Sequence, residues 1–222
     1  NLRPEVRMED GRPWTAEDLK FTFDIFMEQG LPSFRAAFGA MIASVEVLDT
    51  HRVRFTFNED SPIRDRIGLA GMFPAFSKSW FEETGARLDE SSLIPIMGTG
   101  AYALDSYEVN QRIVYSRRDD YWGKDLPQSI GRNNFDSIRV EYFADSNAAF
   151  EGFKAGAYTF RSENSSKQWA TGYDFPAIDK GWVKKEELID GNLAMAQSFV
   201  FNLRREKFQD RRVREAIGLM FN

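Results

Sequence analysis

Residues 97–122 read MGTGAYALDSYEVNQRIVYSRRDDYW, and the rest of the chain can be ordered around this segment. The glycines of Gly98-Thr99-Gly100 tolerate positive φ angles and a close approach of neighbouring backbone. Apolar and polar residues then alternate over 102–117, as expected for paired strands that each bury one face. An aromatic pair, Tyr121-Trp122, closes the segment. The segment therefore predicts a tight glycine turn that leads into a strand pair.

The composition is typical of a globular protein, since 42% of the 222 residues are hydrophobic and 28% are charged. The 20 phenylalanines are unusually many, and they indicate either an aromatic core or apolar faces that meet another surface. The formal net charge is −5 and the basic residues are dispersed, so no nucleic-acid partner is expected. The absence of cysteine excludes disulfides, thiolate metal sites and thiol nucleophiles.

Both ends of the sequence look cut. The first residues, 1–5, lack the basic and apolar regions of a signal peptide. The last residues follow a helical pattern with no glycine or proline stop after it. No run of about 20 consecutive apolar residues is present, so the sequence predicts no transmembrane helix. We therefore expect a piece of a longer chain, with the signal peptide absent from this piece.

The first half of the chain is expected to combine helices with one hairpin. Thr15 is a good N-cap, with Asp18 three residues further on, for a helix that buries most of its surface. A change to a period of two over 44–57 predicts an antiparallel hairpin. Two shorter helices are expected next, over 61–69, where a proline suits the first helical position, and over 77–83.

The second half of the chain is predicted to contain more strand. After the strand pair, a long polar connection runs to about Asn134, and a strand follows over 138–142. A helix capped by Asp145 and ended by Gly156 leads to a further short strand over 158–160, and the three elements together indicate a right-handed crossover unit. We expect three further elements, namely an edge strand over 182–188, an extended apolar segment over 198–203 and a final helix capped by Asp210.

No combination of residues indicates catalysis, a metal site or a cofactor. The single histidine, His51, is expected in a hairpin turn, where it cannot build a catalytic triad or a metal site alone. Gly98-Thr99-Gly100 lacks the lysine of a phosphate loop and leads into a strand instead of a helix. The carboxylate pairs Glu82-Glu83 and Glu186-Glu187 are neighbours in sequence, so their side chains diverge and cannot form an acid/base pair.

A polar segment after the predicted strand at 158–160 has the composition of a ligand pocket. Its candidate residues are Arg161, Glu163, Asn164 and Trp169. A zwitterionic ligand would use such a set, with charges for its ends, an amide for its backbone and a ring for packing. The same residues can equally well cap a surface loop, and the sequence leaves both interpretations open.

Five segments, taken in order, resemble the motifs of one known family, and together they span nearly the whole chain. The segments are Glu9–Leu19 (DG-x-P-x-TAEDV), Gly98–Tyr102 (GTGPY, with Ala101 in place of proline), Arg118–Gly123 (R-x-x-x-YW-G), Phe150–Phe160 (L-x-x-GE-x-D, with Ala157 and Thr159 in place of the acidic residues) and Phe208–Ile217 (F-x-D-x-RVR-x-A). The family is the extracellular solute-binding proteins of family 5, the oligopeptide receptors of ABC importers. Residues 131–136 and 161–175 are more specifically similar to the subgroup that takes up microcin C and related peptides.

The resemblance implies an α/β fold of mixed α+β type, like that of type II periplasmic binding proteins. It also implies a fragment, because mature family members are more than twice this length. Residues 1–13 would end a lobe I strand and form an entry turn, 14–97 would form lobe II, 98–194 would belong to lobe I, and 195–222 would begin a truncated lobe III. Residues before Gly98 and after Tyr102 would then pack in different cores. Complete ligand binding by this fragment is not expected.

The function that the resemblance implies is the capture of extended oligopeptides or peptide-like compounds between lobes, in the periplasm, for delivery to an inner-membrane ABC permease. No catalysis and no cofactor are expected. The residues predicted to face the ligand are Arg161, Glu163, Asn164, Trp169, Phe199, Phe201 and Asn202. Phe199 and Phe201 would serve core packing equally well. Core surface left exposed by the missing portions would also allow the fragment to dimerise.

Two other classes of protein remain open from the residues themselves. A hydrolase acting on peptides or sugars would recruit the many rings and carboxylates, and it predicts convergent titratable groups with shifted pKa values in one pocket. An interaction module without a transport role predicts one broad exposed apolar patch and no cleft.

Overall fold

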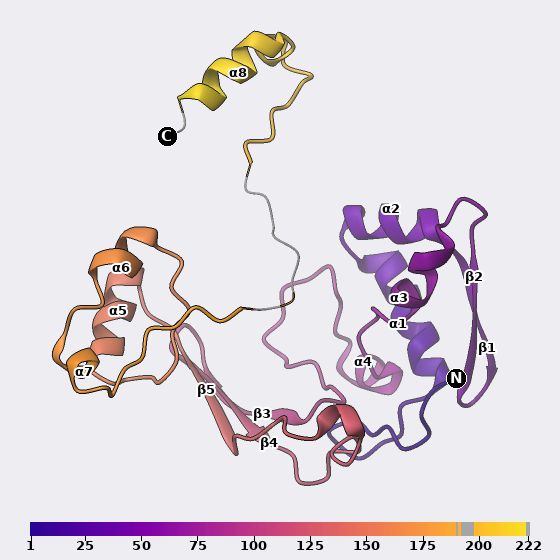
Figure 1. Cartoon of the computed structure of the whole chain (residues 1–222). Coiled ribbons are helices and arrows are strands. Elements are labelled where there is room, and N and C mark those ends of the chain that lie inside the picture. The colour runs from indigo at the N-terminus through magenta and orange to yellow at the C-terminus, as the bar shows by residue number, and fades with distance from the viewer. Residues whose placement is uncertain (190, 192–197, 221–222) are drawn as a thin grey trace. The chain divides into compact units, whose positions relative to one another are not determined.

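The computed structural model describes residues 1–189, 191 and 198–220. The chain divides into two compact units, Asn1–Arg161 and Ser162–Asn222. The first unit contains two antiparallel sheets and the longer helices, whereas the described part of the second contains helices and no strand (Figure 1). The fold is therefore mixed α/β, as the sequence predicted.

Helix α1 (Ala16–Gln29) begins where its capping residues predict. The Asp18 carboxylate accepts hydrogen bonds from the backbone N–H and the hydroxyl of Thr15, both at 2.8 Å, and so fixes the first turn. Only Glu17, Asp24 and Glu28 are exposed along the helix, which confirms the predicted burial of most of its surface. Helix α2 (Pro32–Met41) follows with a proline at its start and was missed, although that proline is a helix-start signal.

Strands β1 (Ile42–Asp49) and β2 (Arg52–Phe57) form the predicted antiparallel hairpin, against which α1 and α2 pack. The buried core of this body consists of Phe23, Phe38, Ile42, Val45 and Leu69. Phe34 stacks on Phe38 with ring centroids 4.1 Å apart, and Phe73 meets Phe38 edge to face at 5.2 Å. The excess of phenylalanine therefore serves an aromatic core, one of the two roles that the composition indicated.

Short helices complete this part of the first unit. They are η1 (Ile63–Asp65), α3 (Arg66–Ala70) and α4 (Lys78–Thr84), close to the predicted ranges. The hydroxyl of Ser77 caps α4 by accepting the N–H of Trp80 at 3.3 Å, and Gly85 ends the helix with a φ of +67°. The indole of Trp14 donates to the carbonyl of Phe76 at 3.0 Å, which ties the start of α1 to the segment before α4.

The second sheet has the strand order β3-β4-β5, with both pairs antiparallel (Figure 1). Its strands are β3 (Tyr102–Glu108), β4 (Arg112–Arg117) and β5 (Ser137–Glu141), and η2 (Pro127–Ser129) lies in the connection before β5. The register aligns Leu104, Tyr115 and Ile138 in one apolar row across the sheet. The hydroxyl of Tyr107 donates to the carbonyl of Leu93 at 2.8 Å, so the segment before the glycine turn lies against this sheet.

Helix α5 (Ser146–Lys154) confirms its predicted cap, but the strand predicted after it is absent. Asp145 accepts the N–H groups of Asn147 and Ala148, both at 2.8 Å. Residues 158–160 form no strand, so the predicted crossover unit is wrong. The reason is local: the hydroxyl of Tyr158 donates to the carbonyl of Ala149 at 2.7 Å, which holds this stretch against α5.

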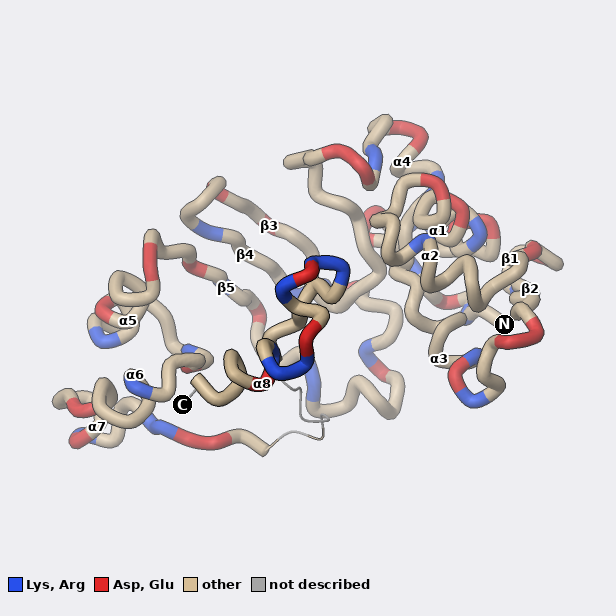
Figure 2. Tube along the Cα trace, turned by 90° about the horizontal axis from the view of Figure 1, so that it is seen from above, with Lys and Arg blue, Asp and Glu red and all other residues tan. Residues whose placement is uncertain are grey.

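The second unit contains α6 (Ser166–Thr171), α7 (Pro176–Asp179), η3 (Glu206–Phe208) and α8 (Arg211–Leu219). Asp210 caps α8 as predicted, by accepting the N–H of Arg212 at 2.8 Å. Figure 2 shows basic and acidic residues interleaved around the start of this helix, where Arg211 and Glu215 form an ion pair at 2.7 Å. The predicted final apolar residue, Phe221, lies outside the described residues.

Two extended segments expected in the second unit are not strands. Residues 182–188, expected as an edge strand, have no ladder partner and no regular structure. Residues 198–203 likewise form no strand. A strand needs a neighbour to satisfy its backbone groups, and none lies beside these segments in the described part of the unit. Among residues 1–189, 191 and 198–220, no helix combines the length and the apolar character needed to cross a membrane.

Candidate functional site

Two of the predicted ligand-binding residues meet at the side chain of Tyr173. Its hydroxyl donates to the Glu163 carboxylate at 3.1 Å, and its ring lies edge to face with Trp169 at a centroid distance of 6.0 Å. Glu163 also accepts the backbone N–H of Ser165 at 2.9 Å, just before α6. Both rings are half-buried. The sequence prediction missed Tyr173, which lies just beyond the end of α6 at Thr171, where helical spacing gives no signal.

Lys185 completes this cluster, and it also was not predicted. Its ammonium lies 4.5 Å from the centroid of the Trp169 ring and 5.8 Å from that of Tyr173. It also donates a hydrogen bond to the backbone carbonyl of Trp169, near the end of α6, where helical carbonyls lack a partner within the helix. A cation is thus held by two aromatic rings and one carbonyl oxygen. We name Glu163, Trp169, Tyr173 and Lys185 the Trp169 cluster.

The remaining predicted residues of this segment do not belong to the Trp169 cluster. Arg161 packs within the first unit, where its guanidinium lies 5.5 Å from the centroid of Phe150 and donates to the hydroxyl of Tyr158 at 3.0 Å. This contact with two rings is a packing role that the sequence prediction did not anticipate. Asn164 is exposed, and no side-chain hydrogen bond of it is recorded within the described part of the chain.

Of the three predicted residues near the end of the chain, Phe201 and Asn202 contact residues close to them in sequence. Phe199 is 65% exposed, whereas the ring of Phe201 lies 5.2 Å from that of Phe208. The side-chain oxygen of Asn202 accepts from the backbone N–H of Arg204 at 3.1 Å and from its Nε at 3.3 Å. Packing is therefore the observed role of Phe201 and turn formation that of Asn202, and neither contact places them in a pocket.

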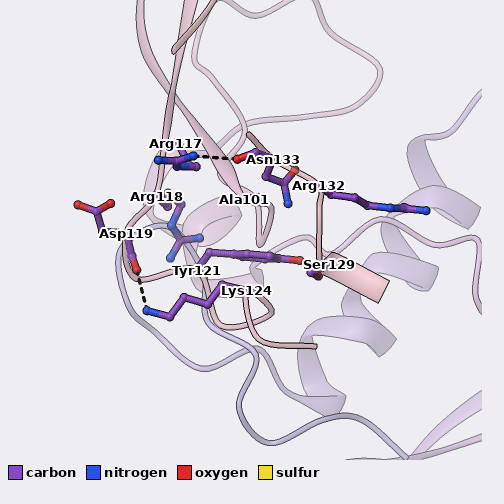
Figure 3. A pocket seen from close by; sticks show the side chains of 9 residues that line it. All are labelled: Ala101, Arg117, Arg118, Asp119, Tyr121, Lys124, Ser129, Arg132 and Asn133. Atoms are coloured by element: carbon purple, nitrogen blue, oxygen red, sulfur yellow. Dashed lines mark hydrogen bonds between the residues drawn. The ribbon is translucent and has the colours of Figure 1, made fainter. Parts of the chain in front are cut away.

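The first unit has a separate cavity of about 310 Å³ beside the end of β4, shown in Figure 3. The side chains that line it are Ala101, Arg117, Arg118, Asp119, Tyr121, Lys124, Ser129, Arg132 and Asn133. The ring of Tyr121 lies across its middle (Figure 3). Arg117 pairs with Asp136, and Arg118 pairs with Asp120 at 3.0 Å, so much of its positive charge is neutralised within the chain.

Arg118 joins this cavity to the glycine turn. Its side chain is only 5% exposed, and it donates to the carbonyl of Met8 at 2.9 Å and to that of Gly100 at 3.3 Å. The same guanidinium donates to Asp120, and these hydrogen bonds hold the pKa of the Asp120 carboxyl below its ordinary value. The indole of Trp122 donates to the carbonyl of Thr99 at 2.9 Å.

The glycine turn is held from its other side by Glu9. The N–H of Gly98 donates to the Glu9 carboxylate at 3.0 Å, and the N–H of Glu9 donates to the carbonyl of Gly98 at 3.0 Å. Neither Gly98 nor Gly100 uses the positive φ that glycine tolerates. The close backbone approach was correct, because a Cβ on Gly98 would lie 3.4 Å from the Glu9 carboxylate. Three segments far apart in sequence therefore converge at one junction of hydrogen bonds.

The segments around Glu9, Gly98 and Arg118 carry three of the motifs that resemble one family. A comparison with family models decides whether the chain belongs to that family. The model of the bacterial extracellular solute-binding proteins, family 5 (middle), matches residues 1–222. The chain belongs to this family. Family 5 proteins bind solutes and are not enzymes. This excludes the peptide- or sugar-acting hydrolase that the sequence alone left open.

One relative of this family 5 chain is the "Probable peptide-binding protein YejA" of Agrobacterium fabrum (strain C58 / ATCC 33970). It is 38% identical over 228 residues, which cover all of this chain and 37% of the relative. The chain thus spans a little over a third of the length of the relative it matches.

Two solved structures share the fold. MoaA of A. tumefaciens R10, in complex with mannopinic acid, superposes with a TM-score of 0.61 at 23% identity, over 77% of this chain and 33% of MoaA. DppA of Helicobacter pylori, in complex with the peptide STSA, has a TM-score of 0.56 at 21% identity, over 76% of this chain and 36% of DppA. The family 5 chain is therefore a mixed α/β part of a larger binding-protein architecture.

Proposed function

We propose that this chain is the middle portion of the substrate-binding subunit of an ABC peptide importer. The receptor captures extended oligopeptides or peptide-like compounds, of the kind related to microcin C, between its lobes in the periplasm and delivers them to an inner-membrane permease. Family membership, a relative named for peptide binding and a structural neighbour with a bound peptide support this choice of ligand.

The observation that carries the proposal is the Trp169 cluster. A half-buried indole and phenol beside the Glu163 carboxylate offer the combination of apolar surface and charge that a peptide ligand uses. Arg161, Asn164, Phe199, Phe201 and Asn202 are proposed as further cleft residues on their positions alone, and Arg161 and Phe201 have the packing contacts described above. Main-chain hydrogen bonds to the peptide supply much of the affinity.

The proposed lobes follow the boundaries expected from the family, namely 14–97 for lobe II, 98–194 for lobe I and 195–222 for the start of lobe III. The phenylalanine core consists of residues before Gly98, which supports the proposed boundary between lobe II and lobe I at residue 98. The stretches on either side of Gly98 lie in the same compact unit, so the junction at Gly98 is proposed as a stiff connection between lobes. The apolar face of the β3-β4-β5 sheet offers a surface through which the isolated chain dimerises.

The decisive test is to identify what the full-length receptor retains. The receptor is purified, its ligands are exchanged against a defined peptide mixture, binding is followed by calorimetry, and the retained compounds are identified by mass spectrometry. Retention of peptides by the native receptor, and at least tenfold weaker retention by the Trp169→Leu variant, is the expected result. Retention of sugar acids or metal complexes with no peptide would refute the ligand class.

A further inference from the structure

The Lys185 ammonium contacts two aromatic rings and one backbone carbonyl. Lysine side chains ordinarily extend into water or pair with a carboxylate, yet Lys185 pairs with no carboxylate among the described residues. Glu186 and Glu187 follow it directly in sequence. Its ammonium instead turns toward Trp169 and Tyr173 and reaches the carbonyl of Trp169.

The groups around the ammonium are all rich in electrons. Indole and phenol faces attract cations through their quadrupoles, and indole does so best. The Glu163 carboxylate accepts the Tyr173 hydroxyl at 3.1 Å, which makes the phenol more electron-rich. The Trp169 carbonyl supplies a directed acceptor for an N–H group. This arrangement favours an organic cation over an anion or a neutral apolar group.

Another lysine in the same unit gives a comparison. Lys180 lies 4.6 Å from the centroid of the Trp182 ring, nearly the same distance as in the Trp169 cluster. Trp182 is 76% exposed, and no second ring or carbonyl contact to the Lys180 ammonium is recorded in the described part of the unit. Lys180 and Trp182 are an ordinary surface pair, whereas Lys185 occupies a site built from three groups.

We propose that Trp169 and Tyr173 form a subsite for a cationic group of the ligand, with Lys185 as an intramolecular stand-in that the ligand displaces. The cation is an alkylammonium or guanidinium, which a peptide presents either at its amino terminus or on a lysine or arginine side chain. This inference rests on the proposed peptide-binding function, since it names the group that the same cluster recognises.

The tether of Lys185 sets the size of the expected effect. A group on a short flexible linker competes at an effective concentration in the millimolar range. A ligand cation of comparable intrinsic affinity must therefore compete with Lys185. If Lys185 leaves the site free for about a tenth to a third of the time, removing the ammonium should strengthen binding of an external cation by roughly three- to tenfold, because the apparent Kd is the intrinsic Kd divided by the free fraction.

The test uses the full-length receptor with n-butylammonium, which matches a lysine side chain, and with 1-butanol as its neutral counterpart at equal ionic strength. Binding is followed by the indole N–H resonance of Trp169 in a ¹⁵N spectrum, assigned with Trp169→Phe. Lys185→Gln is compared with the native chain and with Lys180→Gln, which is the matched control. Both lysines are exposed, so neither change threatens the fold.

The expected result is that Lys185→Gln binds n-butylammonium three- to tenfold more tightly than the native chain, that Lys180→Gln matches the native chain, and that 1-butanol leaves the Trp169 resonance unmoved. Equal affinities in all three proteins, or equal shifts with the ammonium and the alcohol, would refute the subsite.

Peptides added to the full-length receptor separate the two sources of the cation. Loss of binding on N-acetylation assigns the amino terminus, and loss on replacing lysine with norleucine assigns the side chain. Peptides that bind equally well in both neutral forms would overturn the cation subsite while leaving peptide capture intact. A receptor that retains no peptide, with n-butylammonium still bound by Lys185→Gln, would instead refute the proposed function alone.

Discussion

Replacing Arg118 with alanine should destabilise the first unit more than any other single change of a charged side chain around the glycine turn. Arg118 is 5% exposed and donates to the carbonyls of Met8 and Gly100. Replacing it with alanine removes the charged donor of both carbonyls. A hydrogen bond from a charged donor contributes about 1.5–3 kcal/mol, and the longer bond to Gly100 falls at the weak end. The ion pair with Asp120 adds little, because Asp120 is 66% exposed.

The expected loss for Arg118→Ala is therefore about 3 kcal/mol in the free energy of unfolding. Arg118→Lys should lose about half as much, because lysine keeps the charge but cannot reach several acceptors with a planar fork. The assay is urea unfolding of the 222-residue chain, followed by circular dichroism. The dependence of the unfolding free energy on urea concentration should be the same for each variant, so that a shift of the midpoint reports a change in stability.

The neighbouring arginine is the matched control. Arg117 donates to the carbonyl of Asn133 at 3.0 Å and pairs with an Asp136 carboxylate that is 91% exposed. Because Arg117 is itself 36% exposed, water replaces these partners and Arg117→Ala should cost at most about 1 kcal/mol. If Arg118→Ala and Arg117→Ala destabilise the chain equally, the junction does not hold the turn and the reasoning fails.

Four further predictions concern other elements, and urea unfolding at fixed pH checks the first three. Asp145→Ala removes the cap of α5 and should cost about 1 kcal/mol, with no loss if the cap is dispensable. Phe38→Ala empties the aromatic core and should cost about 3–5 kcal/mol, while a cost under 1 kcal/mol would contradict the packing. Gly85→Ala forces a side chain to a φ of +67° and should cost about 1 kcal/mol. Because Arg118 lowers the folded-state pKa of Asp120, this carboxylate stabilises the folded chain above its unfolded pKa and stops doing so as the pH falls through the lower folded value. The stability of the native chain should therefore fall more steeply below about pH 4 than that of Asp120→Asn.

Much of the first unit could be predicted because its signals are local. Thr15 and Asp18 cap α1, alternation marks the hairpin and β3, β4 and β5, and Asp145 caps α5. Such patterns report which face of an element is buried, and they do not depend on distant residues.

The errors arose where contacts between separate segments determine the local structure. Residues 158–160 have strand-like composition, but the hydroxyl of Tyr158 holds the chain on α5. The sequence allowed Gly98 either a positive φ or a close backbone approach, and the contact with Glu9 shows that the close approach is the one used. Segments 182–188 and 198–203 have apolar or alternating residues without a neighbouring strand.

The candidate site was predicted in part. Glu163 and Trp169 were expected to act together, and Tyr173 does join them, but Tyr173 and Lys185 come from stretches that were read as a loop and an edge strand. Arg161 was grouped with Glu163 by sequence proximity, and its recorded contacts are with Phe150 and Tyr158 instead. Proximity along a chain does not fix the direction of a side chain where the backbone turns.

The junction at the glycine turn has a consequence for how this region tolerates sequence change. Two of its donors are the side chains of Arg118 and Trp122, and the acceptors of these two side chains at positions 8, 99 and 100 are main-chain carbonyls, which every residue provides. A substitution of Thr99 therefore leaves its hydrogen bond in place, whereas a substitution of Trp122 removes it. These hydrogen bonds therefore depend on the side chains at 118 and 122 but not on the side chain at 99, so they do not explain the threonine that position 99 shares with the family motif.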